Sequence, residues 1–196
     1  MKKLLAFCLI LIANHGFSQG FIKGIVSRLS FGLKAGANYS NFTNAGFNTD
    51  GSVGFHAGAV VDFKITNNLS FREEFLFSSQ GAKIKDSIFT RENVKVSYFA
   101  VPFVLNLHTN WGLYLEAGSQ FGLRVGENTA KLTSGNFAKR LDMALVGGLG
   151  YQTRSGFGIG LRYVAGVSGV GDFKIAGINP DFHNSVMQAG IFYLFN

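Results

Sequence analysis

The chain has 196 residues, with 18 Lys and Arg against 11 Asp and Glu, a formal net charge of +7 and a single cysteine. A chain of this length forms one domain rather than two, and one cysteine excludes a disulfide framework. After the N-terminal segment, no apolar run approaches the roughly 18 residues that a membrane-spanning helix needs. The 26 glycines and 21 phenylalanines, against two prolines, favour strands with one bulky face and one small face.

The N-terminus has the pattern of a secretory signal peptide, which we predict over residues 1–18. Two lysines precede the apolar run LLAFCLILIA, and Gly16 and Ser18 are the small residues before the expected cleavage point. Cleavage would remove Cys8 and leave 16 basic against 11 acidic residues, a net charge of +5. Because this excess is modest and spread along the chain, we expect no nucleic-acid partner.

Hydrophobic alternation predicts strands along the rest of the chain. In VGFHAGAVVDFKI (53–65) all seven odd-numbered residues are apolar, and most of the even-numbered ones are Gly, His, Asp or Lys. This period of two is typical of a strand with one face in an apolar environment. It predicts eight strands, at residues 31–39, 53–65, 69–79, 98–107, 112–125, 141–151, 157–165 and 187–195. No helical period is convincing after residue 18.

The connections between these strands alternate in length. Three are short polar turns (66–68, 108–111 and 153–155), and four are long (40–52, 80–93, 126–140 and 166–184). Short turns at one end and long loops at the other are typical of outer-membrane barrels, whose short turns face the periplasm. We therefore predict an all-β fold, an eight-stranded antiparallel up-and-down transmembrane β-barrel over residues 30–196 in a bacterial outer membrane. Residues 19–29 would be a short periplasmic tail.

The volume of the side chains decides which face of the barrel points outward. An eight-stranded barrel has an interior only just wide enough for side chains to fill, yet the odd-numbered face carries most of the Phe, Leu and Ile. That face must then contact lipid, and a soluble barrel with its apolar face inside is the rival fold. Aromatic residues gather near the short turns, which predicts a periplasmic girdle of Phe31, Phe63, Phe71, Trp111, Tyr151, Phe157, Tyr193 and Phe195.

The even-numbered, inward face carries charged residues in near balance. We predict a polar lumen network of Lys34, His56, Asp62, Lys64, Arg72, Glu74, Glu116, Arg124, Asp142 and Arg162. Because an unpaired charge in a dry interior costs several kcal/mol, we expect these residues to pair across the barrel and close it to solutes. A gated ion path or proton relay is the alternative. Glu73 falls on the outward face, where we expect it near the membrane interface or beside a bulge.

We predict no enzyme, no metal site and no cofactor. His183 and Ser185 resemble the His-x-Ser dyad of outer-membrane lipid A deacylases, but such a dyad needs a carboxylate to orient the imidazole, and the last strand has none after Asp181. The histidines at 56, 108 and 183 have no metal-site spacing. The glycine-rich segments precede no helix and therefore form no phosphate loop.

The long loops and the last strand suggest partners. Lys131, Lys139 and Arg140 outnumber Glu127 in the 126–140 connection, which supports a hypothesis of contact with lipopolysaccharide phosphates, with a merely solvated loop as the alternative. The aromatic C-terminal strand AGIFYLFN (189–196) must pair with the first strand to close the barrel, and it resembles the segment that barrel assembly machinery recognises. We also expect outer-membrane lipid and an unknown protein as partners, and a monomer.

Four motifs resemble the PorT-like outer-membrane barrel family of Bacteroidetes: REEFLFSSQGAK (72–83), YFAVPFVLN (98–106), LDMALVGGLGY (141–151) and RYVAGV (162–167). Ala100 and Asn106 depart from it, since they replace an acid and a base of the family pattern. The resemblance implies an outer-membrane barrel, and its namesake takes part in protein secretion. We expect a structural or binding role, with a small-solute pore as the alternative and a lipid-modifying enzyme or secretion accessory as more distant ones.

Overall fold

The computed structural model describes residues 19–44, 49–84, 92–128, 138–170 and 182–195. They form one helix, α2 (Gln19–Val26), followed by eight strands. The strands are β1 (Leu29–Thr43), β2 (Thr49–Lys64), β3 (Leu69–Ile84), β4 (Glu92–His108), β5 (Leu113–Asn128), β6 (Leu141–Gln152), β7 (Phe157–Gly166) and β8 (His183–Phe195). In the described part of the chain, no helix is long and apolar enough to cross a membrane.

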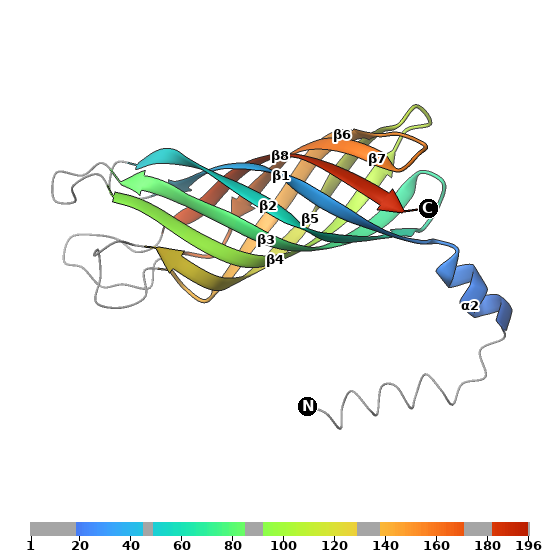
Figure 1. Ribbon diagram of the computed structural model, residues 1–196, viewed down its shortest axis with the longest axis horizontal. Coiled ribbons are helices and arrows are strands. Elements are labelled where there is room, and N and C mark those ends of the chain that lie inside the picture. The colour runs from blue at the N-terminus through green and yellow to red at the C-terminus, as the bar shows by residue number, and fades with distance from the viewer. Residues whose placement is uncertain (1–18, 45–48, 85–91, 129–137, 171–181, 196) are drawn as a thin grey trace, which may run out of the picture.

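The eight strands form a closed antiparallel barrel in which each strand pairs with its neighbour in sequence. β8 pairs with β1 through a continuous register from Phe31 opposite Phe195 to Thr43 opposite His183, which closes the sheet and leaves no free edge. The start of β1, the end of β8 and α2 lie at the same end of the barrel as the short turns (Figure 1). The predicted fold, an eight-stranded up-and-down barrel, is thus confirmed.

Two predictions about local structure were wrong. Residues 19–26 form α2, although no helical period was recognised there. Several strands also extend into segments predicted as long loops: β2 begins at Thr49, β4 at Glu92 and β8 at His183. The reason is physical: apolar alternation marks only the part of a strand whose outward face is apolar, whereas backbone pairing does not depend on side-chain polarity and continues into the polar residues beyond it.

Burial follows the predicted alternation. Outward Leu33 is 60% exposed in the isolated chain, whereas inward Asn38 is 1% exposed. Glu73 lies on the outward face opposite Val61 and Phe103 and two residues from Phe71, near the short-turn end. The register shift between β2 and β3 lies elsewhere, between Gly51 and His56.

Inward glycines make room for the large side chains that fill the lumen. A Cβ atom at Gly158 would come within 2.2 Å of the Phe192 ring, and one at Gly150 within 2.5 Å of the Tyr114 ring. The small face and the few bulky inward residues are therefore complementary, and this explains how a narrow barrel holds buried aromatic and charged groups.

Alanine substitutions at Gly36 and Gly147 test this packing. A Cβ at Gly36 would lie 2.3 Å from the Ala189 carbonyl oxygen and 2.6 Å from His56 Cε1, whereas one at Gly147 would meet nothing within 4 Å. We expect Gly36→Ala to lower the free energy of unfolding by about 1–3 kcal/mol and Gly147→Ala to leave it nearly unchanged. Urea unfolding of the barrel in lipid vesicles measures both, and equal stability of the two variants would contradict this account.

Candidate functional site

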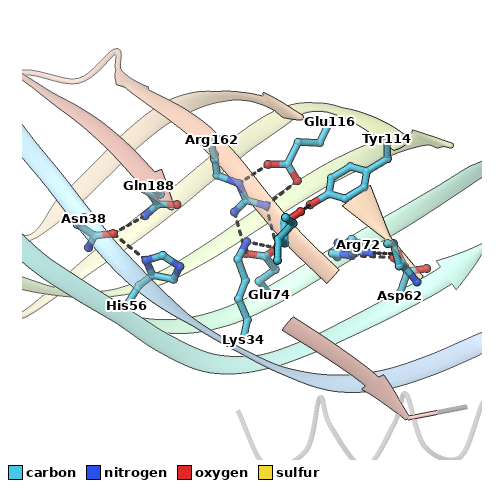
Figure 2. A network of polar contacts seen from close by, with 12 residues as sticks. Lys34, Asn38, His56, Asp62, Arg72, Glu74, Tyr114, Glu116, Arg162 and Gln188 are labelled. Atoms are coloured by element: carbon cyan, nitrogen blue, oxygen red, sulfur yellow. Dashed lines mark hydrogen bonds and ion pairs between the residues drawn. The ribbon is translucent and has the colours of Figure 1, made fainter. Parts of the chain in front are cut away.

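The centre of the lumen is occupied by a cluster of four charged residues from four strands (Figure 2). Arg162 of β7 donates to Glu74 of β3 through Nη1 (2.7 Å) and Nη2 (2.8 Å). It also donates to Glu116 of β5 through Nε (2.6 Å) and Nη2 (2.9 Å). Lys34 of β1 donates to both oxygens of Glu74, at 2.9 and 3.0 Å. One guanidinium group therefore links two carboxylates, and an ammonium group completes the cluster.

We call Lys34, Glu74, Glu116 and Arg162 the central cluster. Its side chains are 11%, 0%, 4% and 3% exposed, respectively. Two cations face two carboxylates, so the cluster is neutral as a whole. A buried charge is tolerated when it is paired and its hydrogen-bonding groups are satisfied, and removing one partner is strongly destabilising. The four residues therefore depend on one another.

A second layer lies between the central cluster and the short turns. Arg72 Nε donates to Asp62 Oδ1 at 2.8 Å, and the Ser70 hydroxyl donates to the same oxygen at 3.1 Å. The Arg72 guanidinium carbon is 4.5 Å from the centre of the Phe192 ring and 5.7 Å from that of Tyr114. With Val60 and Leu194, these rings form a buried apolar cluster. This layer combines a paired charge with an apolar seal.

A third, uncharged layer lies on the long-loop side of the central cluster. Asn38 Oδ1 accepts hydrogen bonds from Gln188 Nε2 (3.1 Å) and from the His56 ring at Nδ1 (2.7 Å). The Asn38 amide donates to the Ser79 carbonyl (2.9 Å) and the Ser78 hydroxyl (3.1 Å). The cavity that borders this layer and the central cluster has a volume of about 10 Å³, which is about the space that one water molecule needs.

The predicted lumen residues occupy different kinds of position. The central cluster, Asp62, Arg72 and His56 lie in the three layers described above. Lys64 is exposed at the short-turn end of β2. Arg124 pairs with Glu127, and Asp142 accepts a hydrogen bond from the Ser168 hydroxyl at 3.1 Å.

Several residues of the lumen were not predicted from the sequence. Asn38, Gln188 and Ser70 are inward and even-numbered, so the same alternation would have found them had uncharged polar residues been included. Glu127 has an odd number, and no pattern signalled it. The register between β4 and β5 shifts between Ser97 and Tyr98, which is a backbone irregularity that a period of two does not reveal.

The eight residues predicted as an aromatic girdle all lie at the short-turn end of the strands or, for Trp111, in the turn between β4 and β5. Phe31 is paired with Phe195, and Phe157 with Tyr193. The rings of Tyr193 and Phe195 contact each other edge to face at 5.4 Å. Their contact with lipid stays a prediction.

The remaining candidate residues lie near or beyond the long-loop end. The Ser185 hydroxyl is 2.8 Å from the Tyr163 hydroxyl, in a hydrogen bond that either can donate. Lys139 and Arg140 are exposed, whereas Lys131 and the predicted signal peptide lie outside the described residues. Among the residues that the structure describes, no group of three or more His, Cys, Asp or Glu side chains is placed to hold a metal ion.

Comparison with known proteins defines the class. The chain belongs to the outer membrane protein beta-barrel domain family, whose model matches residues 17–170. This family places the protein in the bacterial outer membrane. The match is broader than the PorT-like resemblance, which it does not test. No curated protein sequence matches the chain.

Solved structures share the fold at low sequence identity. Neisserial surface protein A has a TM-score of 0.55 and 15% identity, over 84% of this chain and 97% of that one. Ail, the attachment invasion locus protein of Yersinia pestis, has a TM-score of 0.52 and 16% identity, over 85% and 98%. OprG from Pseudomonas aeruginosa has a TM-score of 0.52 and 12% identity, over 85% and 96%. These similarities support the fold alone.

The neighbouring acids Glu73 and Glu74 provide a matched test of the central cluster. Glu74→Gln removes the carboxylate shared by Arg162 and Lys34 and leaves two buried cations with one acid, so we expect a loss of about 3–5 kcal/mol in the free energy of unfolding. Glu73→Gln changes the same side chain on the outward face, and we expect an effect within about 0.5 kcal/mol. Unfolding in lipid vesicles measures both, and a tolerated Glu74→Gln would show that the cluster is dispensable for stability.

Proposed function

We propose that this protein is a closed outer-membrane barrel that acts through its exposed surfaces and carries no solute through its lumen. The observation that carries the proposal is the position of Arg162, which spans the lumen between Glu74 and Glu116 with donor–acceptor distances of 2.6–2.9 Å. A side chain held by four charge-assisted hydrogen bonds is costly to move, because its movement would leave the carboxylates of Glu74 and Glu116 buried without this partner.

A small-solute pore is the alternative function. It requires a continuous water path past the central cluster and past the Arg72, Tyr114 and Phe192 layer. The void beside the cluster, about 10 Å³, is too small for a hydrated ion or a nutrient. The two barriers also differ in chemistry, since one is charged and the other largely aromatic. A single local rearrangement would therefore not open both.

An enzymatic role has less support from the site. Of the two residues that resemble a lipid A deacylase dyad, Ser185 has its hydroxyl paired with Tyr163. A structural and binding role is therefore the one we propose for the protein.

The proposed partners follow from the two exposed surfaces. The odd-numbered apolar face would contact outer-membrane lipid, and the long-loop end would contact lipopolysaccharide or a protein outside the cell. Exposed cations at that end include Lys95, Lys139 and Arg140, which are suited to phosphate groups. We also propose that the chain is exported by its N-terminal signal peptide, is inserted by the barrel assembly machinery and is monomeric.

We also propose that the protein is a member of the PorT-like family. This assignment rests on the four sequence motifs, two of which contain the central-cluster residues Glu74 and Arg162. Membership of this family would make an accessory role in protein secretion one outcome of the interactions at the protein's surface. The genes that neighbour this one test the assignment.

Conductance in planar lipid bilayers tests the closed lumen. We expect the refolded chain from residue 19 onward to insert, as shown by heat-dependent migration on a denaturing gel, and to give no steady channels because the central cluster blocks the path. A porin in the same membranes is the positive control. Steady channels of porin size would overturn the proposal in favour of the pore.

A further inference from the structure

A second feature lies at the short-turn end of the lumen, next to the Arg72 layer. Here a half-open cavity of about 460 Å³ lies between the ends of β2, β4 and β6 and the three short turns. We call it the short-turn vestibule. Its volume falls within the roughly 300–1,000 Å³ of small-molecule sites. In outer-membrane barrels this end faces the periplasm, so the vestibule is accessible to periplasmic solutes.

The vestibule is electropositive. Lys64 and Arg154 line it, both are exposed, and neither has an ion-pair partner among the residues that the structure describes. The one carboxylate in its lining, Asp62, is held by Arg72 Nε at 2.8 Å and by the Ser70 hydroxyl at 3.1 Å. The three turns (65–68, 109–112 and 153–156) contain no Asp or Glu. Two cations are thus left to attract an anion.

The vestibule is also preorganised, because its turns are hydrogen-bonded to one another. The Asn68 side chain donates to the His108 carbonyl at 2.9 Å, and the His108 backbone N–H donates to the Asn68 carbonyl at 2.7 Å. Gly112, at φ 99°, accepts from the Gln152 backbone N–H at 2.8 Å. A site whose walls are already fixed loses little conformational entropy when a ligand binds.

The lining also indicates what kind of anion fits. A volume of about 460 Å³ is much larger than one inorganic ion. The side-chain amides of Asn67 and Asn110 offer donors and acceptors for peptide groups, and Trp111, which is 72% exposed, offers an aromatic surface for an apolar side chain. Two cations, two amides and one aromatic ring suit a short peptide with a free carboxylate.

We propose that the short-turn vestibule binds the free C-terminal carboxylate of a short periplasmic peptide, with Lys64 and Arg154 holding the carboxylate and Trp111 contacting the peptide's apolar side chain. This site lies on the short-turn side of the residues that close the lumen, at the opposite end of the barrel from the long-loop surface. Peptide binding there would give the barrel a contact with the periplasm. This proposal does not depend on whether the barrel conducts ions or solutes.

The protein contains its own probe, since Trp111 is the only tryptophan in the chain and lines the vestibule. The experiment titrates the refolded chain, residues 19–196 in lipid nanodiscs, with acetylated Ala-Ala and Ala-Phe dipeptides, each as the free acid and as the C-terminal amide. We expect a saturable change in Trp111 fluorescence with the free acids and a much weaker response with the amides. Equal binding of acid and amide, or no saturable response, would overturn the proposal.

Substitutions locate the binding site. We expect Lys64→Gln and Arg154→Gln each to weaken binding of the free acids about tenfold, the loss typical of one charge-assisted hydrogen bond. Lys23→Gln, which removes an exposed cation of α2 at the same end, is the control and should bind normally. Unchanged affinity in both vestibule variants would refute the assignment. Inorganic phosphate that binds as tightly as the peptide acids would show a general anion site and would refute the peptide specificity.

Discussion

The structure depends on one buried guanidinium group. Arg162 lies inside a barrel that is barely wide enough for its own side chains, and its charge is compatible with that position only because Glu74 and Glu116 accept from it on two sides. Glu74 also forms an ion pair with Lys34. The four side chains come from β1, β3, β5 and β7, so the same contacts that neutralise the charge also connect alternate strands across the interior.

The difference in side-chain size between the two faces of the sheet follows from this constraint. Side chains as large as Arg162, Arg72 and Phe192 fit a narrow lumen only if neighbouring inward positions are small, which is why glycines such as Gly158 and Gly150 occupy them. The bulky apolar residues are then on the outward face, where lipid makes their exposure favourable. The layered interior leaves an open space at the short-turn end, where Lys64 and Arg154 lie beyond the Arg72 layer.

Alternation along the chain was sufficient to predict the eight strands, their order and the inward position of Glu74, Glu116 and Arg162. It could not predict which acid pairs with which base, because pairs such as Glu74 and Arg162 are 88 residues apart and depend on how far each strand is staggered. It missed Glu127 because the backbone register shifts near Ser97. It also made several strands too short at their long-loop ends, because polar residues there still pair through their backbones. The short-turn vestibule could not be predicted from the sequence, since it is formed by three turns that are distant in the chain.

The central claim is that the lumen is blocked at the level of Glu74, and the accessibility of single cysteines tests it most directly. The chain from residue 19 onward contains no cysteine, and the exposed residues Lys64 and Asp50 lie at opposite ends of the same strand, β2, Lys64 at the short-turn end and Asp50 at the long-loop end. In vesicles whose short turns face the outer solution, a charged thiol reagent that does not cross lipid, added outside, should label Lys64→Cys and not Asp50→Cys. Labelling of both positions at similar rates, in a barrel shown to be folded, would contradict the account.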